Sequence, residues 1–257
     1  MPEKPFSTYN YNACAHAFGG RFTRPFSEVI DVQASTSLPI IGGYGSARVE
    51  NFKYREFISF KAGYTHISGG LQEEDASHNT LVTSTLEGLN LLDVVTADRI
   101  VCRLYSKHQA GKKESEISIV GSKFENLRIA GHPVKVDLDF ELFESIPTYA
   151  AAAKEFAKKS DFRKIAEDPF LNGAKLPEQG PNGAFLCSCV KELDTDCPGV
   201  SPQGHWFHIK GFGRIFLGEL FIKHGERTLN MIRAEFGSST SGSGSGGSGR
   251  TNGTHFP

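Results

Sequence analysis

Apolar and polar residues alternate with a period of two along much of the chain. In residues 134–143, a hydrophobic side chain stands at every second position and charged residues fill most positions between. Side chains of a strand point alternately to its two faces, so this pattern predicts a half-buried antiparallel strand. Residues 58–68 and 99–107 predict further strands. Residues 116–129 predict one whose pattern slips near Glu125, which suggests a bulge.

Two more strands are expected toward the C-terminal end. Residues 211–222 read GFGRIFLGELFI and form the most apolar segment, and residues 228–236 have the composition of a closing strand. The Gly-containing break between them predicts a hairpin with a loop of about five residues.

One segment has the composition of helices. Residues 147–168 read PTYAAAAKEFAKKSDFRKIAED, which is rich in strong helix formers. Thr148 can cap a first helix, and Ser160 or Asp161 can cap a second. We expect a helical insert that lies on a face or edge of the sheet, and a helix that binds a partner or gates a site is the alternative.

Residues 237–249 contain only glycine, serine and one threonine. Such a segment has little apolar surface to offset its ordering entropy, so it predicts a flexible tail over 237–257. A tether to a surface or partner is the functional alternative.

Composition supports a β-rich fold. The chain has 257 residues, with 28 glycines and 20 phenylalanines, which suit strands and tight turns. We therefore predict a mainly β fold, an antiparallel β-sandwich or barrel, in a single domain over 1–236 with a helical insert at 147–168. The strands after the insert are too few to stand alone and should complete the first sheet system.

Charge and hydropathy limit the kinds of partner that the protein is expected to bind. Lysine and arginine total 28 against 29 acidic residues, a net charge of -1, which argues against a nucleic-acid partner and leaves self-association unopposed by repulsion. No stretch is apolar for long enough to predict a membrane span. No signal peptide is visible, so a cytoplasmic location is the default expectation, with export by a route other than Sec as the alternative.

The cysteines could be drawn as a metal site. Cys187, Cys189, Cys197 and His205 would be its ligands, but their spacing differs from that of zinc knuckles. We expect small strand residues instead, with Cys187 and Cys189 on one face of a strand, and neither a metal nor a cofactor.

No motif predicts a catalytic residue. The Gly-rich residues 42–45 are not followed by the Lys-Ser/Thr pair of a phosphate loop. Arg214 and Glu219 interrupt an apolar strand, and because buried charge is costly we expect each to have an ion-pair partner. Trp206 and Tyr64 are candidate stacking residues for a ligand, with His205 beside Trp206, although a packing role for Trp206 is the simpler interpretation.

Part of the sequence resembles a known family. Residues 80–104, TLVTSTLEGLNLLDVVTADRIVCRL, and residues 121–134, GSKFENLRIAGHPV, resemble the choice-of-anchor P type of bacterial surface domain. Residues 211–237 are similar to the end of a set of uncharacterised bacterial proteins. The resemblance implies an all-β fold with no assigned enzyme activity. The chain differs from the surface family in showing no signal peptide and no sorting tail.

Three functions follow as hypotheses. The first is a non-enzymatic β-rich structural or interaction domain that is able to self-associate through an exposed edge or an aromatic patch. The second is a module that binds a small ligand or a carbohydrate between the sheets or at a barrel mouth. The third is a hydrolase with histidine and carboxylate side chains in a cleft.

Overall fold

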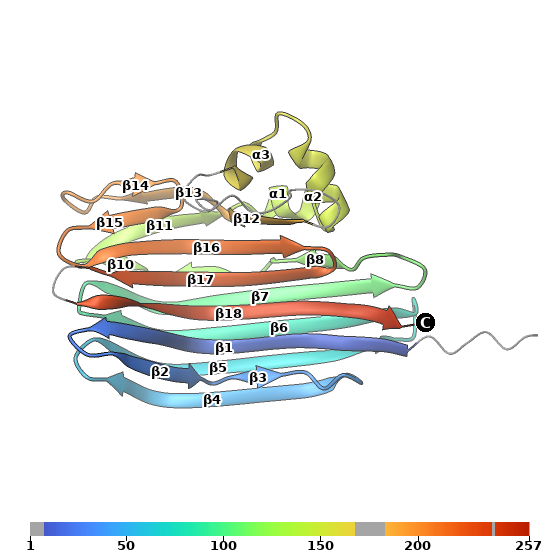
Figure 1. The fold of residues 1–257 in the computed structure, drawn as a ribbon, viewed down its shortest axis with the longest axis horizontal. Coiled ribbons are helices and arrows are strands. Elements are labelled where there is room, and N and C mark those ends of the chain that lie inside the picture. Colours follow the sequence, from blue (N-terminus) through green and yellow to red (C-terminus); the bar gives the residue numbers. More distant parts are fainter. Residues whose placement is uncertain (1–7, 168–182, 238–239, 257) are drawn as a thin grey trace, which may run out of the picture.

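The alternating segments form two antiparallel sheets that share one hydrophobic core (Figure 1). The structure is a computed structural model, and it describes residues 8–167, 183–237 and 240–256. Buried side chains of both sheets meet in the core, among them Phe18 and Leu217 from one sheet and Leu86 and Ile100 from the other. The predicted mainly β, antiparallel architecture is confirmed as a two-sheet sandwich.

The first sheet joins the two ends of the chain. Its strand order is β14 (Pro202–Gln203), β15 (Trp206–Ile209), β16 (Gly213–Lys223), β17 (Glu226–Phe236), β18 (Ser241–Phe256), β1 (Thr8–Arg24) and β2 (Glu28–Gln33), with β12 (Ala184–Ser188) beside β16 and β3 (Thr36–Ser37) beside β1. The strands after the helical insert therefore do complete a sheet that the N-terminal strands begin.

The second sheet is built mainly from the middle of the chain. Its order is β13 (Val190–Thr195), β11 (His132–Leu138), β10 (Arg128–Ile129), β7 (Val95–Gln109), β6 (Ser77–Leu91), β5 (Ile58–Gln72) and β4 (Gly43–Tyr54), with β8 (Glu116–Ser118) and β9 (Lys123–Glu125) beside β7. The predicted strands at 58–68 and 99–107 are confirmed within β5 and β7. Residues 116–129 form three short strands, β8, β9 and β10, instead of one bulged strand.

Along each strand, the alternation of buried and exposed positions shifts by one residue at a certain point. These points lie next to one another on neighbouring strands and form a line across each sheet. Strand registers are the same on both sides of this line, yet one position per strand is skipped in the pairing, and between β5 and β6 Phe60 and Leu89 are skipped as well. In the first sheet the skipped residues are Gly218, Met231, Gly247 and Ala17. In the second sheet they are Asn51, Lys61, Gly88 and Asp98.

A positive φ at alternate strands produces this change. Gly218, Gly247, Gly88 and Asn51 have φ of 61°, 63°, 65° and 51°. Because neighbouring strands each skip one residue at the same level, pairing resumes in the same register while the buried positions move from odd to even numbers or the reverse. In β1, Ala15 and Ala17 are buried before the line, and Phe18 and Phe22 are buried after it.

Replacing Gly218 by alanine is expected to destabilise the protein strongly. Its φ of 61° disfavours a side chain, and an added Cβ would lie 2.8 Å from the Cys189 sulfur. Together the backbone strain and overpacking should cost about 2–5 kcal/mol. Urea unfolding measures the loss, with Gly70→Ala as the control because nothing lies within 4 Å of a Cβ there. Equal unfolding midpoints for the two variants would contradict this explanation of the phase change.

The predicted flexible tail is wrong for Ser241–Phe256. These residues form β18, which pairs with β17 on one side and with β1 on the other (Figure 1). Ser243 faces outward, while Gly244 and Gly246 face inward and are buried. A Cβ on Gly244 would lie 2.8 Å from Phe18 Cζ, so glycine at this position lets a large core side chain approach the backbone. Residues 238–239 and 257 of the predicted tail lie outside the described residues.

The helical insert is confirmed, but it begins earlier than expected. It consists of α1 (Phe140–Ser145), α2 (Tyr149–Phe156) and α3 (Asp161–Ala166), which lie together at one edge of the sandwich (Figure 1). Thr148 and Ser160 cap α2 and α3 as predicted. The strand expected over 134–143 ends at Leu138, because Asp139 caps α1 and its carboxylate accepts from the Leu142 N–H. Residue 168 lies outside the described residues.

The C-terminal hairpin is confirmed with a shorter loop. Lys223 pairs with Glu226, so two residues connect β16 and β17 in place of the expected five or so. Gly225 has a φ of 65°, which suits a tight hairpin turn. Among the described residues, no helix combines the length and the apolar character needed to cross a membrane.

Candidate functional site

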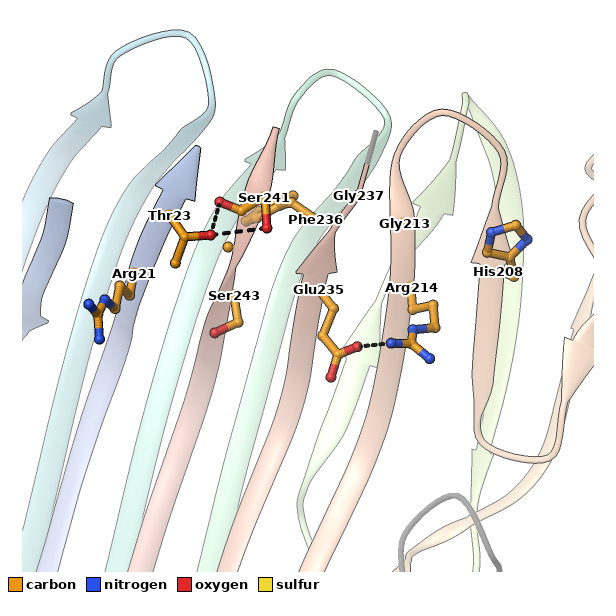
Figure 2. Close-up of a pocket in the computed structure, with 11 residues that line it drawn as sticks. Arg21, Thr23, His208, Gly213, Arg214, Glu235, Phe236, Gly237, Ser241 and Ser243 are labelled. Atoms are coloured by element: carbon orange, nitrogen blue, oxygen red, sulfur yellow. Dashed lines mark hydrogen bonds and ion pairs between the residues drawn. The ribbon is translucent and has the colours of Figure 1, made fainter. Parts of the chain in front are cut away.

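An open hollow of about 600 Å³ lies on the outer face of the first sheet, where β16, β17, β18 and β1 reach one end of the sandwich (Figure 2). Its lining residues are Arg21, Thr23, His208, Gly213, Arg214, Glu235, Phe236, Gly237, Ser241, Gly242 and Ser243. The neighbouring positions Phe22 and Ala234 are buried in the core, which places Arg21 and Glu235 on the solvent side.

One row of paired residues crosses this hollow. Strand pairing aligns His208 with Arg214, Arg214 with Glu235, Glu235 with Ser243, and Ser243 with Arg21. Paired residues of neighbouring strands share a face of the sheet, so five strands each present one polar side chain. Arg21 and Arg214 are three strand spacings apart, which separates their backbones by about 14 Å.

Glu235, the acidic residue of this row, forms ion pairs with two arginines. Arg214 lies 2.7 Å from a Glu235 oxygen, and Arg233 Nη1 also donates to Glu235. Arg233 in turn binds Glu219 through two hydrogen bonds of 2.7 and 2.6 Å. Two guanidinium groups therefore bind Glu235 and occupy its oxygens.

The ion pairs of this network confirm that Arg214 and Glu219 each have a partner of opposite charge. Each was predicted to have an ion-pair partner, and each has one, but the two do not pair with each other. Their partners Glu235 and Arg233 lie on the adjacent strand β17.

An aromatic layer lies beside the row on the same strands. Arg233 stands over the Phe216 ring, with its guanidinium carbon 3.8 Å from the ring centroid. Burial lowers the pKa of Arg233, but the bonds to Glu219 and Glu235 outweigh that effect and the pKa is raised. The Trp206 ring stacks on Phe216 at 5.8 Å. Trp206 and Phe216 are paired residues two positions along from His208 and Arg214, so an aromatic surface adjoins the hollow.

Small and hydroxyl-bearing residues form the floor. The Thr23 hydroxyl donates to the Ser241 carbonyl at 3.1 Å and lies 3.0 Å from its hydroxyl (Figure 2). A Cβ on Gly242 would clash with the Arg21 carbonyl oxygen, and one on Gly213 would clash with that of Glu235. Glycine at these two positions lets the backbones of neighbouring strands approach closely at this end of the sheet.

Arg21 differs from Arg214 and Arg233, which both have ion-pair partners. Its side chain is exposed, and no carboxylate of the residues that the structure describes lies within ion-pair distance of it. In Figure 2 it stands on the opposite side of Ser243 from the Arg214–Glu235 pair. The row thus combines two arginines with one carboxylate. Arg214 pairs with that carboxylate, so the charge of Arg21 is available to bind an acidic group of a ligand.

The predicted ligand-binding residues do not form one site. Trp206 is half-buried on the outer face of the first sheet, and His205 is buried with its ring 6.0 Å from Phe216. Tyr64 lies on β5 of the second sheet, where it donates to Glu87 at 3.0 Å and accepts from Arg99 at 3.0 Å. The structure therefore keeps Trp206 and His205 near the hollow and separates Tyr64 from them.

The cysteines are free thiols in the core. Cys187, Cys189 and Cys197 are all buried, and burial raises the pKa of Cys187 and raises that of Cys189 to about 12. The expectation that Cys187 and Cys189 share a strand is wrong, because β12 ends at Ser188 and β13 begins at Val190. Within the described ranges, no three or more His, Cys, Asp or Glu side chains are grouped so as to hold a metal ion.

Arg21, Glu235 and Ser243 were not predicted as site residues. They come together only through strand pairing across β1, β18 and β17. The serine–glycine alternation of 241–246 was the available signal, since a period of two places serines on one face and glycines on the other.

One family model matches the chain, under the description "Domain of unknown function (DUF8256)", over residues 9–175 and 168–223. No curated protein and no solved structure matches the chain. The resemblance of residues 80–104 and 121–134 to choice-of-anchor P type domains stays a prediction.

Proposed function

The chain belongs to the DUF8256 family of domains of unknown function, and because that description assigns no activity, we propose a function from the hollow itself. The protein is a non-enzymatic binding module whose first sheet binds an acidic oligosaccharide across the ends of β16, β17, β18 and β1. The observation that carries this proposal is the row Arg214–Glu235–Ser243–Arg21, in which Arg21 has no acidic partner among the described residues.

The spacing of the arginines favours an elongated ligand. The backbones of Arg21 and Arg214 are about 14 Å apart, so two arginine side chains that stand side by side on the sheet are matched best by a ligand with two acidic groups. Arginine binds carboxylate and sulfate groups through paired hydrogen bonds. The hydroxyls of Ser241 and Ser243 between the arginines suit a polyhydroxylated ligand, and Trp206 offers a ring for stacking at the margin.

The same geometry favours binding over hydrolysis. A general base needs a carboxylate with free oxygens, whereas the oxygens of Glu235 accept from Arg214 and Arg233. His208 is exposed on β15, where its paired neighbour is Arg214 and not an acid. Binding through an open sheet face agrees with the broader hypothesis of an interaction domain, and self-association of that domain stays a prediction.

Calorimetric titration with defined oligosaccharides tests the proposal. Trigalacturonate and a sulfated heparin tetrasaccharide supply the two acidic groups, and maltotriose is the neutral control. At least one acidic probe should bind tenfold or more tighter than maltotriose, and its affinity should fall as salt screens the arginines. Failure of both acidic probes to bind, or equal binding of the neutral one, would overturn the proposal.

A further inference from the structure

A second arginine of β17 lies on the opposite face of the first sheet, inside the sandwich. Arg227 is only 1% exposed, and its neighbours along the strand face, Leu229 and Met231, belong to the core. Arg227 Nη2 donates to the carbonyl of Ile146, the residue at the end of α1. The side chain thus ties the helical insert to the sheet, but a carbonyl oxygen does not neutralise a cation.

Glu114, an acid whose charge acts on Arg227, has other partners. Glu114 accepts from the Tyr149 N–H at 2.7 Å through one oxygen, and its other oxygen lies 3.3 Å from His224 Nε2. No carboxylate oxygen of the described residues lies within ion-pair distance of Arg227. Burial lowers the pKa of Arg227 to about 10, against smaller opposing effects of Cys187 and Glu114, so the group stays cationic at neutral pH. A buried cation without an adjacent anion is costly.

Two buried polar atoms in this region also lack hydrogen-bond partners. They are Arg227 Nη1 and Thr251 Oγ1, and no described residue bonds to either. Arg227 and Thr251 are paired residues of β17 and β18, and both side chains are buried. Paired side chains on one face have Cβ atoms about 5 Å apart, so the two side chains start from neighbouring positions, and a small group that lies between them can accept from both.

We propose that Arg227 and Thr251 bind a small monovalent anion of the halide class, with chloride as the physiological candidate, between the sheets. A halide accepts from the guanidinium and the hydroxyl together and also supplies the missing negative charge. A buried water would satisfy the two donors but would leave the charge of Arg227 unbalanced. The site is separate from the outer hollow, because its residues face the core.

Thermal unfolding in matched salts tests the anion. When chloride replaces gluconate at constant ionic strength, the midpoint of the wild-type protein should rise by about 3 °C, because a ligand of the folded state stabilises it. Thr251→Val should lose most of that rise. Thr85→Val, a buried threonine on β6, is the matched control and should keep it.

Crystals grown with bromide give a readout that does not depend on stability. An anomalous peak beside Arg227 Nη1 and Thr251 Oγ1 is expected in the wild-type protein and should be absent in Thr251→Val. The proposal fails if the wild-type midpoint is equal in chloride and gluconate. It also fails if Thr251→Val keeps the full rise, or if bromide crystals show only a water at this position.

Discussion

A chain that ends at Gly237 is expected to lose cooperative folding. Strand β18 lies in the middle of the first sheet, so its removal leaves the backbone groups of β17 and β1 without their partners. It also uncovers the core side of the sheet, including Phe18, which packs against Gly244. Folded domains are stable by only about 5–15 kcal/mol, and the loss of a central strand exceeds that margin. Near-ultraviolet circular dichroism and urea titration should show no cooperative transition.

Full-length variants test which side chains of β18 the fold depends on. Replacing Ser243 and Ser245 by threonine keeps the inward glycines and raises the strand propensity of the outer face, so this variant should fold and unfold cooperatively. Replacing the inward Gly244 by valine instead should cost several kcal/mol through overpacking against Phe18, on the order of 3 kcal/mol. Unfolding of the truncated chain at the full-length midpoint would show that residues 241–256 do not belong to the sheet.

The second large effect concerns ligand binding. Arg21→Gln should weaken binding of the acidic oligosaccharide about tenfold to one-hundredfold, because it removes a charge-assisted hydrogen bond without breaking an ion pair of the protein. Arg214→Gln should weaken binding as well, but it also frees Glu235 from one partner. Combining both substitutions should abolish measurable binding to trigalacturonate.

Arg48→Gln is the matched control for these variants. Arg48 is an exposed arginine of β4 on the second sheet, where it pairs with Glu50, and its side chain is 61% exposed. This variant should bind the acidic probe like the wild type and unfold at the same midpoint. Wild-type affinity in Arg21→Gln would remove the hollow from consideration as the binding site.

The sequence predicted the class of fold because alternation is a local property. Residues 58–68 and 99–107 read as strands without knowledge of their partners, and the alanine-rich segment after Thr148 read as helix. The line of skipped residues was harder to see, since a φ above zero at Gly218 or Gly247 becomes visible only when neighbouring strands are aligned. The same change of phase explains why a strict period of two fails over long stretches of these strands.

The prediction of a flexible tail is wrong for Ser241–Phe256 for a related reason. A segment of glycine and serine has no apolar side chains to bury, and composition alone therefore predicts a coil. In the structure the neighbouring sheet supplies the apolar groups, and Gly244 and Gly246 supply the space for them. The partners of Arg214 and Glu219 were missed because they lie on β17, which pairs with β16 in a register fixed by the two-residue hairpin.

Chemical-shift mapping by nuclear magnetic resonance tests the central claim most directly. Trigalacturonate is titrated into the ¹⁵N-labelled full-length protein, and the backbone amide shifts are followed residue by residue. The account predicts the largest shifts at Arg21, Ser243 and Glu235, with smaller ones near Trp206 and none around Tyr64 on the second sheet. Shifts confined to the second sheet, or saturable binding that leaves the amides of the hollow unchanged, would contradict it.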